Sequence, residues 1–152
     1  MNIRRAKADD MEEILALTCR VFEGEQEIPR SLNPIPAERC PQWWCAEEDG
    51  ALLGCVALFR EDGGWHMGRF ALLPACRGRH LGTALLRAAL SEVFQQDIPA
   101  VSMEARDTTV HILKKFGARV TGDPFPFYRG MVTPMCLTRE DFLRAVQPAA
   151  QV

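Results

Sequence analysis

The sequence of 152 residues has no apolar run approaching the roughly 20 residues that a membrane-spanning helix needs. Its first residues carry charges but no apolar stretch follows them, so we expect no signal peptide, no membrane partner and a cytoplasmic location. The chain also lacks an excess of basic residues, because 18 lysines and arginines stand against 20 aspartates and glutamates. This balance argues against a nucleic-acid-binding module that depends on an overall positive field.

Cysteine pairs with the spacing of zinc sites are absent too. Among the six cysteines the closest pair is Cys40 and Cys45, which have no second pair and no nearby histidine. Zinc favours Cys-x-x-Cys pairs or close histidines, and an even cysteine count suggests disulfides only in a short secreted chain. We therefore expect six reduced thiols and no metal.

The overall composition is that of an ordinary globular protein. The hydrophobic fraction is 47% and the charged fraction 25%, which is too apolar for a wholly disordered chain. A chain of this length can bury a core without disulfide or metal support. We expect a single domain over residues 1–147 and a C-terminal tail over 148–152.

Two hydrophobic periodicities alternate along the chain and predict an α+β fold with a mixed sheet. Apolar residues at helical spacing predict one helix after Asp9, its expected N-cap, and a longer helix from Leu81. Two turn signals, Glu48-Asp49-Gly50 and Asp62-Gly63-Gly64, predict a three-stranded meander. The predicted elements in chain order are a strand from Ile3, a helix over 10–22, strands over 43–47, 52–60 and 65–73, a helix from 81, a strand over 100–105, a helix over 108–116, and strands over 118–121 and 131–137 before a helix capped by Thr138.

Between residues 23 and 41 four prolines interrupt the pattern and predict an irregular loop. A loop of this length within a compact domain is uncommon and often functional. A surface segment without a role is the alternative.

The residues that point to chemistry lie where a predicted buried strand runs into a basic turn and a long helix. Helix N-termini carry unpaired N–H groups and partial positive charge, which suits them to bind anions. Gly78 and Gly82 allow a ligand close to the backbone, and Arg77 and Arg79 add positive charge. The segment indicates a pyrophosphate-binding turn, although two glycines alone are more often part of an ordinary strand–turn–helix. It has neither the P-loop nor the GxGxxG pattern.

This turn resembles motif A of the Gcn5-related N-acetyltransferase (GNAT) family, written Arg/Gln-x-x-Gly-x-Gly/Ala after a strand that ends in proline. Arg77, Gly82 and Pro74 match the motif, while His80 stands at a turn position where glycine is common. Two further regions are similar to the family. Ser102–Arg106 with Lys114–Ala118 resembles its fifth strand and following helix, and residues 21–29 resemble a Phe-x-x-Glu-Gln element of a bacterial subgroup.

The resemblance implies a GNAT-like mixed, mostly antiparallel central sheet flanked by helices, and an acetyl-CoA-dependent acyltransferase. A primary amine of a small-molecule or peptide acceptor would attack the thioester directly, with a backbone N–H near Leu72 or Leu73 holding the oxyanion. The residues expected to bind acetyl-CoA are Phe70, Ala71, Leu72 and Leu73 along the pantetheine arm, and Arg77, Gly78, Arg79, His80, Leu81, Gly82 and Thr83 around the diphosphate.

The resemblance also suggests catalytic candidates. Glu25 and Glu104 are candidate bases, because the amine must be neutral to attack. The family's tyrosine acid aligns with Leu113, so Tyr128, the only tyrosine, is the candidate substitute. A solvated carboxylate, or a tyrosine that only packs, is the alternative in each case. We expect His66 and His111 on exposed faces.

Two other functions stay open. His80 and Leu113 depart from the family pattern, which suggests a non-catalytic CoA-binding or regulatory domain of the same fold. An interaction module without a ligand is the second alternative. No motif identifies the acceptor or the oligomeric state, and a homodimer is left open.

Overall fold

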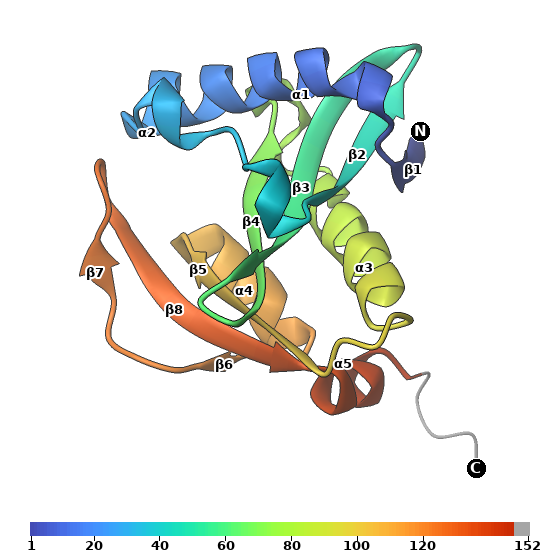
Figure 1. Cartoon of the computed structure of the whole chain (residues 1–152), viewed down its shortest axis with the longest axis vertical. Coiled ribbons are helices and arrows are strands. Elements are labelled where there is room, and N and C mark those ends of the chain that lie inside the picture. Colours follow the sequence, from blue (N-terminus) through green and yellow to red (C-terminus); the bar gives the residue numbers. More distant parts are fainter. Residues whose placement is uncertain (148–152) are drawn as a thin grey trace.

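The computed structural model describes residues 1–147, so the predicted tail at 148–152 lies outside the described residues. A central mixed sheet, mostly antiparallel, has helices on both faces, which confirms the predicted fold class (Figure 1). The strands are β1 (Asn2–Arg5), β2 (Gln42–Glu48), β3 (Ala51–Glu61), β4 (Gly64–Leu72), β5 (Ala100–Ala105), β6 (Arg119–Val120), β7 (Phe125–Pro126) and β8 (Met131–Thr138). The α-helices are α1 (Met11–Thr18), α2 (Gly24–Gln26), α3 (Leu81–Val93), α4 (Asp107–Lys115) and α5 (Arg139–Val146). No helix of this described part is long and apolar enough to cross a bilayer.

The sheet changes character between its fourth and fifth strands. Its order is β1-β2-β3-β4-β5-β8-β6, with β7 paired to β8. Every pairing is antiparallel except that of β4 with β5, which is parallel and consists of one residue pair, His66 with Ser102. The pairing stops beyond this residue pair. The backbone N–H and C=O groups on the facing edges of the C-terminal halves of β4 and β5 are therefore not hydrogen-bonded to one another.

A bulge in β4 lies beside this gap. Ala57 pairs with Gly68 and Cys55 with Ala71, so two residues of β4, Arg69 and Phe70, stand opposite a single residue of β3. Arg69 takes a left-handed φ of +57°. An extra residue bends and twists the strand that carries it. The bulge therefore turns β4 away from β5 where the two strands separate.

Hydrophobic cores on the two faces of the sheet hold β4 in place. On one face Leu86 of α3 and Leu113 of α4 belong to a cluster against which Phe70 and Leu72 pack. On the other face Ile14 and Leu17 of α1 pack with Phe59 and Ala71. Successive strand residues point to opposite faces, which explains why neighbours in β4 belong to different cores. Figure 1 shows α1 and α2 on one side of the sheet and α3 on the other.

The helix termini show what local sequence does and does not determine. Asp141 N–H donates to Thr138 Oγ1 at 3.0 Å, so the predicted cap of α5 is confirmed. The predicted cap of α1 was wrong, since Asp9 lies inside a 3₁₀ turn, Ala8–Asp10, that leads into the helix. Asp10 accepts a hydrogen bond from Lys7 N–H at 2.7 Å and binds the Arg4 guanidinium. The predicted loop at 23–41 contains α2 and two short 3₁₀ turns, Arg30–Leu32 and Ala37–Arg39.

Candidate functional site

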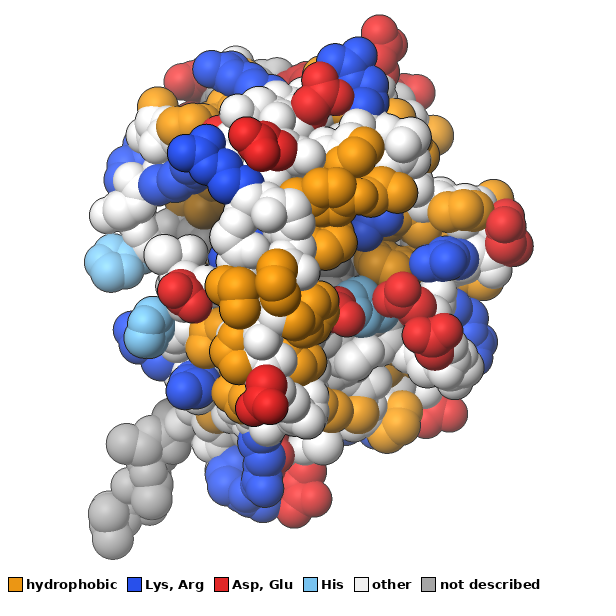
Figure 2. Space-filling model, turned by 90° about the vertical axis from the view of Figure 1, so that its left-hand side faces the viewer, with side chains coloured by type: hydrophobic (Ala, Val, Ile, Leu, Met, Phe, Trp, Pro, Cys, Tyr) orange, Lys and Arg blue, Asp and Glu red, His pale blue; other side chains and the backbone are white. Residues whose placement is uncertain are grey.

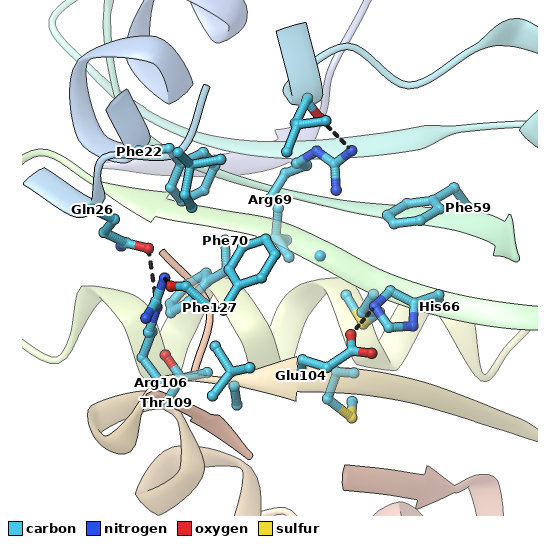
Figure 3. A pocket seen from close by; sticks show the side chains of 18 of the residues that line it. Phe22, Gln26, Phe59, His66, Arg69, Phe70, Glu104, Arg106, Thr109 and Phe127 are labelled. Carbon is cyan, nitrogen blue, oxygen red and sulfur yellow. Dashed lines mark hydrogen bonds and ion pairs between the residues drawn. The ribbon is translucent and has the colours of Figure 1, made fainter. Parts of the chain in front are cut away.

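A pocket of about 430 Å³ lies where β4 and β5 separate (Figure 3). Leu86 and Leu113 line it from the α3–α4 face of the sheet, and Phe22 and Ile28 line it from the α1 face. Since these residues belong to opposite cores, the pocket reaches through the sheet between the two strands. Two molecules that enter from opposite faces can therefore meet inside it.

The outer face beside this pocket is rich in apolar side chains. Figure 2 shows them gathered next to a hollow, on the side of the molecule that carries α2 and the β7–β8 region. The exposed large apolar residues between β6 and β8 are Val120, Phe125, Phe127, Tyr128 and Met131. Phe125 and Phe127 also line the pocket, so the apolar surface continues into it.

The turn between β4 and α3 has the geometry of an anion site. Ala84 N–H donates to His80 O at 3.1 Å. The N–H groups of Leu81, Gly82 and Thr83 lie in the first turn of α3. N–H groups in the first turn of a helix have no carbonyl acceptor within that helix. Arg79 is exposed beside them. These N–H groups and the helix dipole favour a bound phosphate.

Gly78 and His80 give the turn its shape. Both take left-handed backbone conformations, with φ of +81° and +61°. Glycine adopts such a conformation without strain, whereas for histidine it costs about 1–2 kcal/mol. His80 therefore reproduces the conformation for which the family commonly uses glycine, with stored strain.

Gly82 has a packing role that the sequence did not reveal. A Cβ atom at this position would lie 3.1 Å from Phe70 Cζ and 3.2 Å from Leu72 Cδ1. Both distances are tighter than ordinary Cβ contacts. Glycine therefore lets the start of α3 pack closely on the side chains of β4 that border the gap.

The edge of β4 leaves one of the two predicted oxyanion donors available. Leu73 N–H donates to Leu53 O of β3 at 2.9 Å and is already paired. Because backbone groups alternate between the two edges of a strand, those of Leu72 point toward the β5 side. Leu72 O accepts a hydrogen bond from Arg77 Nη2 there, at 2.9 Å. Of the other expected pantetheine contacts, Phe70 lines the pocket while the Ala71 side chain is buried toward α1.

Arg77 and Glu25, expected in different roles, bind one another. Arg77 Nη1 and Nη2 donate to the two carboxylate oxygens of Glu25 at 2.7 and 3.0 Å. Together with the bond to Leu72 O, this pair links α2 to the end of β4. Neither side chain lines the pocket.

Glu104 does line the pocket, together with His66. His66 Nε2 lies 2.9 Å from Glu104 Oε2, and its Nδ1 lies 3.0 Å from Ser102 Oγ and 3.4 Å from Glu61 Oε2. The bond from His66 holds the pKa of Glu104 below its usual range. The expectation of an exposed His66 was wrong, since it is only 8% exposed. His66 is buried because it sits at the one β4–β5 pair and packs against the ring of Phe59, tilted by 48°.

Tyr128 lies outside the pocket lining. It is 51% exposed and meets the ring of Phe127 edge-on, at 4.9 Å between centroids. Its neighbour Phe127 lines the pocket instead. Leu113, at the position of the family's tyrosine acid, is buried and also lines the pocket.

Arg69 and Arg106 line the pocket as well, and sequence reasoning had not selected Arg69 for it. Arg69 is a charged residue in an otherwise apolar strand end, and that contrast was the available signal. Arg106 Nε donates to Gln26 Oε1 at 3.1 Å, and its Nη1 and Nη2 donate to the carbonyls of Arg129 and Phe127 at 2.8 and 3.1 Å. Arg129 N–H also donates to Gln26 O at 3.1 Å. These bonds join α2 to the loop before β8 across one end of the pocket.

Residues 1–147 contain no group of three or more His, Cys, Asp or Glu side chains arranged to hold a metal ion. All six cysteines are free thiols in the structure, and burial raises the pKa of Cys45 and Cys55.

Comparison with known proteins identifies the relatives of this chain. The family model described as "Acetyltransferase (GNAT) family" matches residues 8–118. A curated relative, the peptidyl-lysine N-acetyltransferase YjaB of Escherichia coli, is 26% identical over 134 residues, which cover 80% of this chain and 84% of that protein.

Solved structures agree on the fold. Escherichia coli ElaA superposes with a TM-score of 0.76 at 17% identity, over 89% of this chain and 97% of the other. A GNAT family acetyltransferase from Brucella melitensis, solved in complex with acetyl-CoA, superposes with a TM-score of 0.66 at 22% identity, over 87% of this chain and 94% of the other.

Proposed function

The chain belongs to the GNAT family of acetyltransferases, and from this premise we propose that it transfers an acetyl group from acetyl-CoA to a primary amine. The observation that carries the proposal is the pocket that passes through the sheet between β4 and β5. A thioester donor and an amine acceptor must meet with their reacting atoms in contact while their bulky parts stay apart. A passage with one opening on each face of the sheet provides this arrangement.

The α3 face suits the donor. The unpaired N–H groups of Leu81, Gly82 and Thr83 offer hydrogen bonds to a diphosphate, with Arg79 adding positive charge. The free β4 edge leads from this turn to the pocket and can bind an extended pantetheine arm in the manner of an added strand. Leu72 N–H, which points into the gap, is the donor we assign to the carbonyl oxygen that becomes negative during attack.

The α1 face suits the acceptor. Glu104 is the base we assign, since it is a carboxylate that lines the pocket. It takes the proton of the amine as the new N–C bond forms and the C–S bond breaks. His66 is a positioning residue, because its bond to Glu104 fixes the carboxylate at the pocket wall. The departing thiolate takes a proton from solvent, because Tyr128 lies outside the pocket lining.

The structure and the relatives both favour an amine acceptor over a ligand-free role. Two carboxylates, Glu61 and Glu104, line the pocket and attract an ammonium group. The name of the Escherichia coli relative likewise specifies an amine nitrogen as acceptor. A non-catalytic CoA-binding domain would need the donor turn but not these carboxylates.

Calorimetry with acetyl-CoA and a turnover assay with a panel of amines, followed by thiol release, test the proposal. Acetyl-CoA at 100 times its Kd should stabilise the fold by about 2.7 kcal/mol. Arg79→Ala should weaken acetyl-CoA binding by about threefold or more, because a charge beside a diphosphate is lost. Arg60→Ala, which removes an exposed arginine stacked on Trp65, is the matched control and should leave binding unchanged. Binding without thiol release for any amine would identify a non-catalytic domain, and no binding at millimolar acetyl-CoA would refute the assignment.

A further inference from the structure

Arg69 presents an unsatisfied positive charge to the acceptor side of the pocket. Its Nε donates to Asn33 O at 3.0 Å and its Nη2 to Leu32 O at 2.9 Å. Within the described chain, its Nη1 has no hydrogen-bond partner and no carboxylate forms an ion pair with the guanidinium. The guanidinium lies over the Phe59 ring, with Cζ 5.2 Å from the centroid. Burial lowers the pKa of Arg69, so its charge is poorly solvated.

Glu61, the carboxylate that lines the pocket near this end, acts on Arg69 through its charge but forms no ion pair with it. Glu61 contacts Arg39 at 3.8 Å and His66 Nδ1 at 3.4 Å. A half-buried charge without a paired carboxylate is poorly solvated, and a planar guanidinium with free N–H groups fits a carboxylate in a bidentate manner. Two carbonyl oxygens hold one side of the Arg69 fork in place, so its remaining N–H groups are preorganised for such a ligand.

A negative region lies across the pocket from Arg69. Figure 3 shows the Arg69 guanidinium on one side of the cavity and the Glu104–His66 pair on the other, with the rings of Phe59 and Phe70 nearby. Glu104 attracts an amine, whereas Arg69 attracts an anion. The pocket thus combines poles of opposite charge with an apolar wall to which Phe22, Ile28 and Leu32 also contribute.

The size of the site favours a small acceptor. The pocket of about 430 Å³ lies within the range of roughly 300–1,000 Å³ typical of small-molecule sites, and the end of the donor must share it. The bonds of Arg106 and Arg129 to Gln26 close one end of the pocket.

Resting on the proposed acetyl transfer, we infer that the acceptor is a small amine that also carries a carboxylate, such as a free amino acid with an apolar side chain. Arg69 binds the acceptor carboxylate and is a specificity-determining residue. Glu104 faces the amine, and the apolar wall contacts the side chain.

Matched acceptor pairs test this inference without any variant. L-leucine, L-phenylalanine and L-methionine are compared with their carboxamides, which keep the amine and the side chain but lose the carboxylate charge. We expect kcat/KM for the free acids to exceed that for the amides by about tenfold or more, because a site built for a charged group rejects its neutral analogue. A preference for the amides, or for a lysine peptide with blocked ends, would overturn the inference.

Variants locate the preference at Arg69. Arg69→Met should raise the KM of the acids by about tenfold or more and change that of the amides by less than about twofold, since only the acids lose a charged contact. Arg69→Lys keeps a charge but not the planar guanidinium. The KM of the acids in this variant should lie between those of wild type and Arg69→Met. The matched control Arg60→Met removes a charge outside the pocket and should leave the KM of both the acids and the amides unchanged. An equal effect of Arg69→Met on acids and amides, in a variant with the wild-type melting temperature, would contradict the role of Arg69.

Failure of this inference and failure of the proposed function give different results. If acetyl-CoA binds and the amides are acetylated as well as the acids, the enzyme is an acetyltransferase without a carboxylate requirement. If acetyl-CoA neither binds nor is consumed, both proposals fall. The comparison of acids with amides on the wild-type protein stays decisive even if Arg69→Met does not fold.

Discussion

Arg77 holds both carboxylate oxygens of Glu25, at 2.7 and 3.0 Å, and so joins the end of β4 to α2. A carboxylate whose two oxygens face a guanidinium is poorly placed to take a proton from an amine. Glu104 has one oxygen on His66 and lines the pocket. The two candidate bases predicted from sequence thus differ in their partners and in their access to the acceptor.

Glu25→Gln is therefore expected to have little effect on proton transfer. The variant keeps the shape of the side chain and loses the ion pair with Arg77. The side chains of Glu25 and Arg77 are both more than a third exposed. Such pairs contribute at most about 1 kcal/mol. Turnover at saturating amine should stay within about threefold of wild type. The ratio of variant to wild-type turnover should not change as pH rises. A loss of about 10²-fold that recovers as pH rises would instead assign the base to Glu25.

Glu104→Gln should lower turnover by about 10²-fold at neutral pH, because the amine proton loses its acceptor. The His66 bond lowers the folded-state pKa of Glu104, so the wild-type carboxylate stays ionised below its ordinary value of 4.5. The acidic limb of the wild-type rate profile should then follow protonation of the amine, not of Glu104. Initial-rate profiles of kcat/KM against pH for both proteins check this.

The same shift has a consequence for stability with a definite sign. A lowered folded-state pKa contributes stability above the unfolded-state pKa and loses it as pH falls through the folded-state pKa. The stability difference between wild type and Glu104→Gln should therefore be constant at neutral pH and shrink in acid, below the ordinary value of 4.5. Urea unfolding across this range measures it, and a difference that grows in acid would contradict the assigned direction.

Much of the fold, including the turn between β4 and α3, could be predicted from sequence because the signals are local. Turn glycines, helical spacing and the Arg77–Gly82 pattern each depend on neighbours in the chain. The acceptor side could not be predicted this way. His66 is buried because Ser102 and Glu104 come from a strand 36 or more residues away, and Arg69 reaches the carbonyls of a loop 36 residues before it. Only the pairing of β4 with β5 and the loop packing bring these groups together.

His80→Gly should stabilise the protein. The substitution relieves about 1–2 kcal/mol of left-handed backbone strain and adds about 0.5–1 kcal/mol of unfolded-state entropy, so the free energy of unfolding should rise by roughly 0.5–1 kcal/mol. Arg79→Gly is the matched control, since Arg79 has no positive φ and gains no relief. Urea unfolding of both variants separates the two effects. Equal destabilisation by both would show that His80 is not strained.

Tyr128→Phe tests the last candidate for proton transfer. The sequence predicts Tyr128 as the acid because Leu113, at the position of the family's tyrosine, has no hydroxyl. A phenol with a pKa near 10 can protonate a thiolate whose conjugate acid has a pKa near 8.5. The ring, however, is 51% exposed and packs edge-on against Phe127, outside the pocket lining. We therefore expect kcat to stay within about twofold of wild type, with solvent as the proton source.

The kinetic constants separate the roles that Tyr128 can have. Loss of an acid lowers kcat at unchanged acetyl-CoA affinity, whereas loss of an acceptor contact mainly raises the acceptor's KM. Phe127→Leu provides the comparison, because Phe127 lines the pocket and its loss should raise the acceptor's KM without a change in proton transfer. A fall in kcat of about tenfold or more in Tyr128→Phe, largest at high pH where solvent is a poorer donor, would establish Tyr128 as the acid and require its loop to turn toward the pocket during the reaction.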